Sequence, residues 1–433
     1  MEIEAAAGQA VLRGAFAAAA ELFGAACRLT PAENHEPLVR RTLGQASALL
    51  RTGDVADARR LAARLEMEGQ PPALQAERLQ LLAEVEWDDG SIPLATSYLE
   101  RALEVAGDDP PLSARISARL VLITVPGNPA RALQHAERAV RQVDGERDPL
   151  VLSSLLIDLC LLDLMLGGSP RTGLMRRGLA IEEGAGPSAY PHPVPLIWFQ
   201  CTDDVEATRE RHAREADWAR NHSDETHAAE RLSYLALVEF HAGRCDLAER
   251  LIEQSCNTIE ERLEVRGRFA YPFAWRSLMD AYRGRPDRAR ATLLPLVAET
   301  AHEQKSWWAA VLLSVLGFVE FAAGDYRAAD DALSRMGRLF DQIGMRDGLL
   351  DRTEPFHAEL LVQLGHLDRA REALVRLEHR GRAFPRTWID MTLPRTRAIV
   401  LAAEGDLRAP SGRSSPSTPT QQHDCPSSSA GRG

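Results

Sequence analysis

The stretch Gly324-Asp325-Tyr326-Arg327-Ala328-Ala329 decides the fold of this chain. It follows an apolar run over 307–323 that is long enough for a helix. Glycine tolerates the positive φ that a tight turn after a helix requires, and the residues behind it favour a second helix. The stretch is therefore typical of the turn inside a helical hairpin.

The same pattern recurs as a glycine, then an apolar residue or proline two places later, and a small residue five places later. The glycines of the pattern are Gly14, Gly53, Gly90, Gly127, Gly168, Gly243, Gly284, Gly324, Gly365 and Gly405. They lie 37 to 41 residues apart, except for an interval of 75 that begins at Gly168; there the stretch 203–207 marks a unit without its glycine. A period of this length predicts about eleven stacked helical hairpins, an all-α superhelical solenoid similar to tetratricopeptide (TPR) arrays.

Two further positions of the repeat carry small residues. Five places after the glycine stand Ala19, Ala58, Ala95, Ala132, Gly173, Ala248, Ala289, Ala329 and Ala370. Seven places before it stand Ala7, Ala46, Ala83, Ala236, Ser277, Gly317, Ala358 and Ala398. We expect these positions to face each other inside a hairpin, so that its two helices approach closely.

The composition excludes several classes of function. The chain carries a net charge of −11, which disfavours binding to the phosphates of nucleic acids. Its only lysine, Lys305, lacks the glycine-rich turn of a phosphate loop, so no P-loop ATPase is predicted. No nucleophile elbow or dinucleotide-binding turn is present, and the six cysteines form no Cys-x-x-Cys pair. We therefore predict no enzyme, no cofactor, no metal site and no direct contact with nucleic acid.

The chain divides into an array over 1–408 and a Ser/Pro-rich tail over 409–433, which is expected to be disordered. The repeat breaks off at Pro410, which suggests a truncated or frame-shifted reading of a longer gene. Four prolines interrupt the array at 184–195, either as a ligand-facing or partner-facing loop or as a plain connector. No signal peptide or membrane segment is evident, and the cytoplasm is the expected compartment.

An aromatic cluster spans two adjacent units and offers candidate ligand-binding residues. Those residues are Tyr271, Trp275, Arg276, Gln304, Trp307 and Trp308, with Phe273 and Tyr282 beside them. Rings with nearby polar groups suit a sugar or another small polar ligand in the concave groove of a solenoid, where a protein partner is the other expected occupant. The alternative is that the rings fill the core between hairpins.

Several phrases carry a resemblance to a known family. They are Asp88-Asp89-Gly90-Ser91-Ile92, Trp307-Trp308-Ala309-Ala310, Leu316-Gly317-Phe318-Val319-Glu320 and Gly365-His366-Leu367-Asp368-Arg369-Ala370. Residues 1–408 resemble the helical sensor region of large actinobacterial LuxR-family transcriptional regulators, relatives of the maltose regulon activator. The resemblance implies a signal-sensing and protein-interaction module, here without the family's ATPase and helix-turn-helix ends. The corresponding region of nucleotide-cyclase-type signalling proteins and a freestanding TPR-like scaffold are the alternatives.

Overall fold

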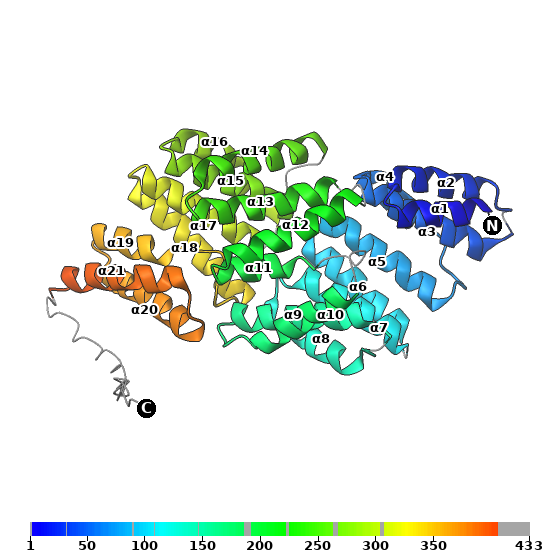
Figure 1. Ribbon diagram of the computed structural model, residues 1–433, viewed down its shortest axis with the longest axis horizontal. Helices are drawn as coiled ribbons and strands as arrows, with labels where there is room; N and C mark the ends of the chain where they lie inside the picture. Colours follow the sequence, from blue (N-terminus) through cyan, green and yellow to red (C-terminus); the bar gives the residue numbers. More distant parts are fainter. Residues whose placement is uncertain are drawn as a thin grey trace, which may run out of the picture.

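The computed structural model describes residues 2–31, 33–88, 91–107, 109–145, 147–185, 192–221, 225–262, 267–303 and 307–405. These residues form 21 α-helices and one short 3-10 helix, with no strand among them. The helices stack from the N-terminus at one end of the molecule to α21 (Thr387–Ala403) at the other (Figure 1). The predicted all-α superhelical solenoid is confirmed.

The helices pair into ten hairpins and the first helix of an eleventh. The first helices are α1 (Glu2–Leu12), α3 (His35–Arg51), α5 (Pro72–Asp88), α7 (Pro110–Thr124), α9 (Pro149–Met165), α11 (Val194–Cys201), α13 (Glu225–His241), α15 (Tyr271–Tyr282), α17 (Trp307–Ala322), α19 (Glu354–Gln363) and α21. The second helices are α2 (Phe16–Arg28), α4 (Val55–Arg64), α6 (Ile92–Ala106), α8 (Pro129–Gln142), α10 (Thr172–Gly184), α12 (Val205–Asn221), α14 (Cys245–Arg262), α16 (Pro286–Glu303), α18 (Tyr326–Ile343) and α20 (Leu367–Ala383). The 3-10 helix η1 (Gly267–Ala270) precedes α15.

Most hinge glycines adopt the left-handed conformation that their place in the repeat requires. Gly324 has a φ of 81°, and positive φ values recur at Gly14, Gly53, Gly243, Gly284, Gly365 and Gly405. After Gly324, the carboxylate of Asp325 accepts a hydrogen bond of 3.0 Å from the amide of Ala328 and so caps α18. In the unit without a glycine, Asp203 itself has a φ of 57°. The turn is thus kept where the glycine is missing.

Two hinges differ from the predicted pattern, and Gly90 lies outside the described residues. Gly127 is absent from the positive-φ residues, and in the next unit Gly167, with a φ of 80°, takes the place expected for Gly168. The connection from α9 to α10 is longer than in other hairpins, so the five-residue spacing fails and Gly173 is exposed. Gly178 makes the close contact instead, because a Cβ there would lie 2.9 Å from the Ser153 carbonyl oxygen.

Small residues let the two helices of a hairpin touch. Ala329 on α18 has no exposed surface. On the facing helix α17, a Cβ added to Gly317 would lie 2.6 Å from the side chain of Leu333. At the end of the array Ala398 is exposed, because no described helix follows α21. The small residues on the first helices are therefore buried by the second helix of their own hairpin.

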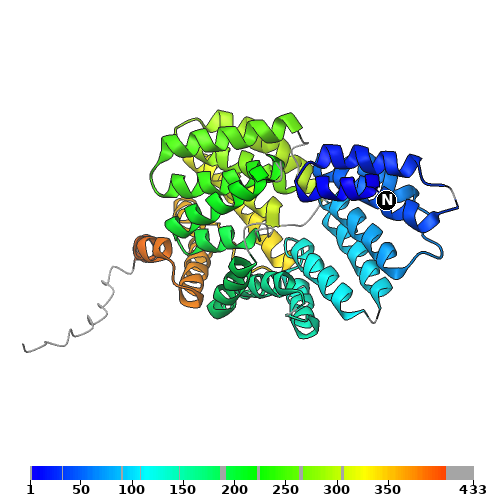
Figure 2. The ribbon, with the colours of Figure 1, turned by 45° about the vertical axis from the view of Figure 1, so that its right-hand side comes forward.

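The superhelix closes on itself. The first helices of successive hairpins contact one another and form the inner layer of the array. The amide of Trp307 donates to the carbonyl of Pro126 (2.7 Å), and the amide of Arg346 donates to that of Met165 (2.8 Å). These partners lie about 180 residues apart, so the fourth hairpin meets the ninth, and the fifth meets the segment that follows the ninth. In Figure 2, helices of the yellow part of the chain accordingly lie between the green and the cyan hairpins.

The described part of the chain contains no helix that is both long and apolar enough to cross a membrane.

In the interrupted stretch 184–195, α10 ends at Gly184 and α11 begins at Val194, while residues 186–191 lie outside the described part. The predicted Ser/Pro-rich tail, 409–433, also lies outside it.

Candidate functional site

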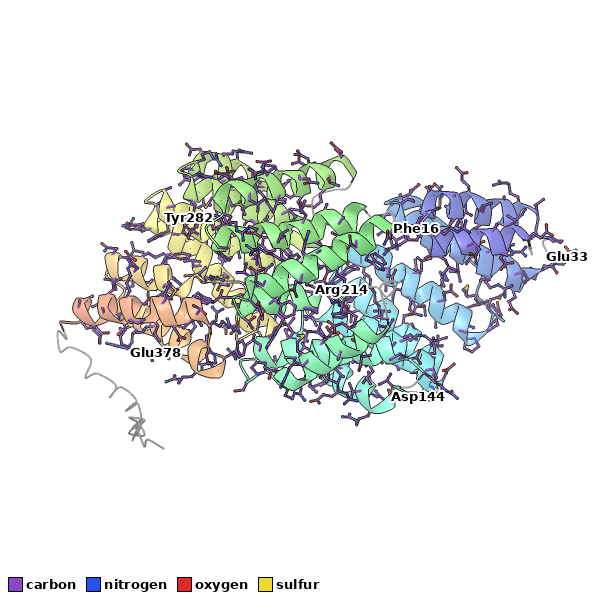
Figure 3. The ribbon with its side chains drawn as sticks, in the orientation of Figure 1. Phe16, Glu33, Asp144, Arg214, Tyr282 and Glu378 are labelled. Atoms are coloured by element: carbon purple, nitrogen blue, oxygen red, sulfur yellow. The ribbon has the colours of Figure 1, made fainter. Side chains whose placement is uncertain are left out.

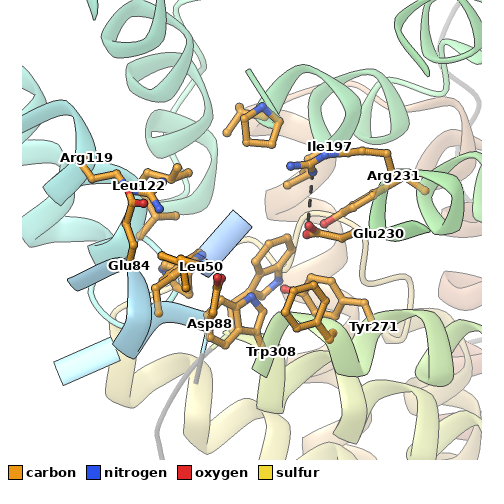
Figure 4. Close-up of a pocket in the computed structure, with 18 of the residues that line it drawn as sticks. Leu50, Glu84, Asp88, Arg119, Leu122, Ile197, Glu230, Arg231, Tyr271 and Trp308 are labelled. Atoms are coloured by element: carbon orange, nitrogen blue, oxygen red, sulfur yellow. Dashed lines mark ion pairs between the residues drawn. The ribbon is translucent and has the colours of Figure 1, made fainter. Parts of the chain in front are cut away.

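A cavity of about 360 Å³ lies where the two turns of the superhelix meet. Its walls come from the inner layer: each first helix from α3 to α17 contributes at least one side chain. The volume is at the lower end of the range for pockets that bind small molecules. The close-up in Figure 4 shows side chains from hairpins far apart in sequence facing one another across this space.

Aromatic rings form one side of the cavity. Trp87 from α5 and Trp308 from α17 meet edge to face, with ring centroids 4.9 Å apart. Trp307 packs against Tyr271, with centroids 5.7 Å apart. All four residues are at least nine-tenths buried. Burial also raises the pKa of the Tyr271 hydroxyl well above its ordinary value, so this side chain remains neutral.

The structure brings three of the six candidate binding residues to the cavity: Tyr271, Trp307 and Trp308. Trp275 lies behind Tyr271, stacked on it with centroids 5.5 Å apart, and is buried against Tyr234. For Trp275 the geometry therefore matches the core alternative, whereas the other three rings also border open space.

The remaining candidates lie elsewhere. The guanidinium of Arg276 covers the Phe273 ring at 4.9 Å and lies 3.5 Å from the carboxylate of Glu253. Tyr282 is 61% exposed and stacks on Phe318 on a different part of the array. Gln304 lies outside the described residues. Arg276 and Tyr282 therefore do not line the cavity.

Two oppositely charged pairs supply the polar part of the cavity walls. On one wall Arg119 of α7 lies 3.3 Å from Glu84 of α5. On the other, Arg231 and Glu230 are neighbours on α13 with their charged groups 4.0 Å apart. Figure 4 shows the two pairs on opposite sides of the space, with Trp308 below them. Each wall therefore presents a carboxylate and a guanidinium.

A chain of buried charges continues behind α13. The guanidinium of Arg231 lies 3.2 Å from Glu215, which accepts a hydrogen bond of 2.8 Å from Arg211. Arg211 also contacts Glu182 and donates to the carbonyl of His192. Burial raises the pKa of Glu215 to about 7, against the pull of Arg231 and Arg211. The cavity wall is thereby linked to the residue that follows the undescribed stretch 186–191.

The row of buried charges continues outward to the molecular surface. Arg214, labelled near the middle of Figure 3, lies 3.2 Å from Glu183 and 3.8 Å from Glu182. Its side chain is 45% exposed, so the buried charges reach solvent at this point.

A second group of buried charges, the C-terminal charge cluster, lies where the α9, α11 and α19–α21 regions meet. Arg380 contacts Glu354 at 2.7 Å, and Asp347 accepts from Arg386 at 2.5 Å. Burial alone would raise the pKa of Asp347, but Arg380 and Arg386 hold it below its ordinary value. Beside the cluster, Asp203 receives hydrogen bonds from Arg352 (2.7 Å) and from the amide of Trp388 (3.2 Å). Asp203 thereby joins the turn between α11 and α12 to α21 and to the segment before α19.

Three buried thiols of the array are poor nucleophiles. Burial raises the pKa of Cys160, Cys201 and Cys256 to about 12, so these thiols are protonated and poor nucleophiles. Among the described residues no group of three His, Cys, Asp or Glu side chains is placed to hold a metal ion. What the cavity presents is a set of rings, apolar side chains and paired charges.

Sequence reasoning missed Trp87, Glu84, Arg119, Glu230 and Arg231. All five lie on first helices, and the repeat register could have placed them in the inner layer. Nothing in the period indicates which inner-layer residues face one another across the superhelix, because those residues belong to hairpins three to six places apart.

No protein-family model and no curated protein matches this sequence. Among solved structures, the chain is similar to a Rap protein complexed with Competence and Sporulation Factor, at 12% identity and a TM-score of 0.48, covering 84% of this chain and 99% of that one. It is similar to yeast Tom70 at 11% identity and a TM-score of 0.41, covering 94% and 96%. For the APC/C hetero-tetramer Cut9-Hcn1 the values are 12%, 0.31, 90% and 95%. With TM-scores below 0.5 these similarities support no functional assignment, and the TPR-like solenoid fold rests on the chain's own helices and hinges.

Proposed function

We propose that this protein is a non-enzymatic sensor module that binds a small organic ligand in the central cavity and a protein partner on its helical surface. The observation that carries the proposal is the cavity itself. It is enclosed by rings such as Trp87 and Trp308 and by charged pairs on opposite walls. Pockets with an apolar lining and a few convergent polar groups are typical small-molecule sites.

The position of the cavity gives a ligand a means to act at a distance. Its walls combine hairpins from both turns of the superhelix, α3 to α7 on one side and α13 to α17 on the other. A ligand that contacts both sides favours the arrangement in which they are close. Because a ligand shifts a conformational equilibrium by its difference in affinity for the two states, binding here would change the pitch of the array and the surface offered to a partner.

The resemblance to LuxR-family regulators gives this sensor a biological setting. We propose that the array is the signal-sensing part of such a regulator, with no ATPase or DNA-binding activity of its own. The reading frames next to the coding sequence test this setting: a downstream helix-turn-helix frame supports the regulator, and an upstream cyclase frame supports the cyclase-type alternative.

Thermal unfolding of the full chain with a library of small organic molecules tests ligand binding. A ligand at a hundred times its dissociation constant adds about 2.7 kcal/mol of stability. The stabilisation should disappear in Leu122→Trp, which fills the cavity from a half-buried position on α7. Equal stabilisation of the variant would place the ligand elsewhere, and a library without any stabilising compound would refute the sensor.

A further inference from the structure

The charges on the cavity walls indicate the kind of ligand that fits between them. One wall carries Glu84 and Arg119, and the opposite wall carries Glu230 and Arg231. Arg51 and Asp88 also border the cavity, which gives three carboxylates and three guanidiniums in all. Such a balance selects neither a cation nor an anion, whereas a molecule with one charge of each sign can meet a partner on both walls.

On the α13 wall, the Glu230 carboxylate belongs to a buried side chain that lines the cavity. Arg231 is held from behind by Glu215, at 3.2 Å, which is closer than its distance of 4.0 Å to Glu230. Glu230 is only 4% exposed. A buried carboxylate interacts more strongly with a cation than an exposed one does, because the surrounding medium screens less. Glu230 therefore favours an ammonium group.

On the opposite wall, the guanidinium is the better placed group. The side chain of Glu84 is 40% exposed and that of Arg119 is 28% exposed. Although Arg119 Nε lies 3.3 Å from Glu84, this buried N–H makes no hydrogen bond of good geometry. A carboxylate placed before Arg119 would complete the bonding of its planar guanidinium. This wall therefore favours the negative end of a ligand.

The space between the two walls is apolar and contains one unused donor. Leu122, Ile197 and Trp308 line it. Trp307 is 4% exposed, borders the cavity, and its indole Nε1 has no hydrogen-bond partner in the described part of the chain. A buried donor of this kind is costly unless it meets an acceptor. A carbonyl oxygen in the middle of the ligand would satisfy it.

We propose that the cavity binds a zwitterion with an apolar body, of the amino-acid or short-peptide type. Its ammonium lies against Glu230, its carboxylate against Arg119, and its carbonyl oxygen accepts from the Trp307 indole. This inference rests on the proposed sensor function and names the ligand class of the same cavity.

Calorimetry with the full chain and the dipeptide L-leucyl-L-phenylalanine tests this assignment. N-acetylation removes the positive end of the probe and amidation removes the negative end. We expect each capped form to bind at least about tenfold more weakly than the dipeptide, as loss of one buried charged contact of about 1.4 kcal/mol predicts. Free L-phenylalanine shows which size of zwitterion fits better.

Two variants assign each end to its wall. In Glu230→Gln, the dipeptide and its N-acetyl form should bind equally, while the amide form remains weaker. In Arg119→Gln, the dipeptide and the amide form should bind equally, while the N-acetyl form remains weaker. Glu137→Gln and Arg138→Gln, on the exposed face of α8, serve as matched controls and should bind all probes as the wild type does.

The outcomes separate this inference from the proposed function. The zwitterion assignment is wrong if the capped forms bind wild-type protein as tightly as the dipeptide, or if none of these probes binds. In either case, a stabilising compound from the library would still support the proposed sensor function. If Glu230→Gln does not fold, Glu230→Asp keeps the charge and should retain a reduced preference for the free amino end. Loss of that preference in a folded Glu230→Asp protein would also count against the assignment.

Discussion

The central cavity and the C-terminal charge cluster both contain buried charged side chains, but they hold those charges differently. In the cluster, Arg380 and Arg386 contact their carboxylates at 2.7 and 2.5 Å. Within the cavity walls, the distances are 3.3 Å for Arg119–Glu84 and 4.0 Å for Arg231–Glu230. The tight pairs fasten the last hairpins of the array together, whereas the wider pairs border open space. We propose that this difference separates a structural contact from a binding site.

Breaking the C-terminal charge cluster should have the largest effect on stability. Asp347→Asn leaves Arg380 and Arg386 buried without their shared carboxylate, and removing one partner of a buried ion pair typically costs about 3 to 5 kcal/mol. Denaturant unfolding followed by circular dichroism measures the loss. Asp341→Asn is the control: its carboxylate is 72% exposed and 3.1 Å from Arg346, so about 1 kcal/mol or less is expected. Similar losses in both variants would show that the cluster does not fasten the array.

The next effect concerns the pH dependence of stability near the cavity. Burial raises the pKa of Glu215 to about 7 from an ordinary value of 4.5, so between these pH values the folded protein retains a proton that the unfolded chain releases. The contribution of Glu215 to stability therefore falls as pH rises through this window and is constant above it, by at most about 3 kcal/mol.

Glu215→Gln should remove this fall. The difference in unfolding free energy between wild type and variant should then decrease from pH 5 to pH 7 and level off by about pH 8. Glu183→Gln, at a side chain that is 60% exposed, should leave the slope unchanged. Parallel stability curves for wild type and Glu215→Gln would contradict the assignment of the raised pKa to this residue.

Overpacking the interior of a regular hairpin should cost less than breaking the charge cluster. Ala329 has no exposed surface, and the leucine of Ala329→Leu has no space between α17 and α18, so about 1 to 3 kcal/mol is expected. The transition should broaden, because the loss acts on one hairpin and its neighbours. In thermal melts Arg327→Ala, on the same helix, should change stability by about 0.5 kcal/mol or less. A leucine variant that melts no lower than the arginine variant would remove the packing role from this position.

The smallest effect on stability is expected for a substitution beside the central cavity. Leu122→Phe adds volume beside the cavity, so it should cost less than about 1 kcal/mol, in contrast to Ala329→Leu. The added ring occupies ligand space, and the affinity for any cavity ligand should fall at least about tenfold. Thermal melts and calorimetry measure the two effects. A large loss of stability without loss of binding would show that the space beside Leu122 is not part of the site.

The sequence is sufficient to predict the structure of a regular single hairpin. The period of about forty residues predicts the number of units, and the unit whose hinge lacks glycine is found at Asp203, which keeps a φ of 57°. Contacts inside a hairpin link residues close in sequence, so local signals such as a turn glycine and a small residue at a fixed spacing specify them. Where the spacing changes, as between Gly168 and Gly173, the same signals misplace the contact.

The cavity is formed by the superhelix as a whole and by no single hairpin. Glu230 faces Arg119, and Trp308 meets Trp87, only because each hairpin is rotated slightly against the previous one and the rotations add up until the second turn meets the first. No fixed spacing along the chain records this sum. The sequence alone therefore identified rings of the cavity, Tyr271, Trp307 and Trp308, while the tertiary structure determined which charges stand opposite them, because superhelical curvature brings distant hairpins together.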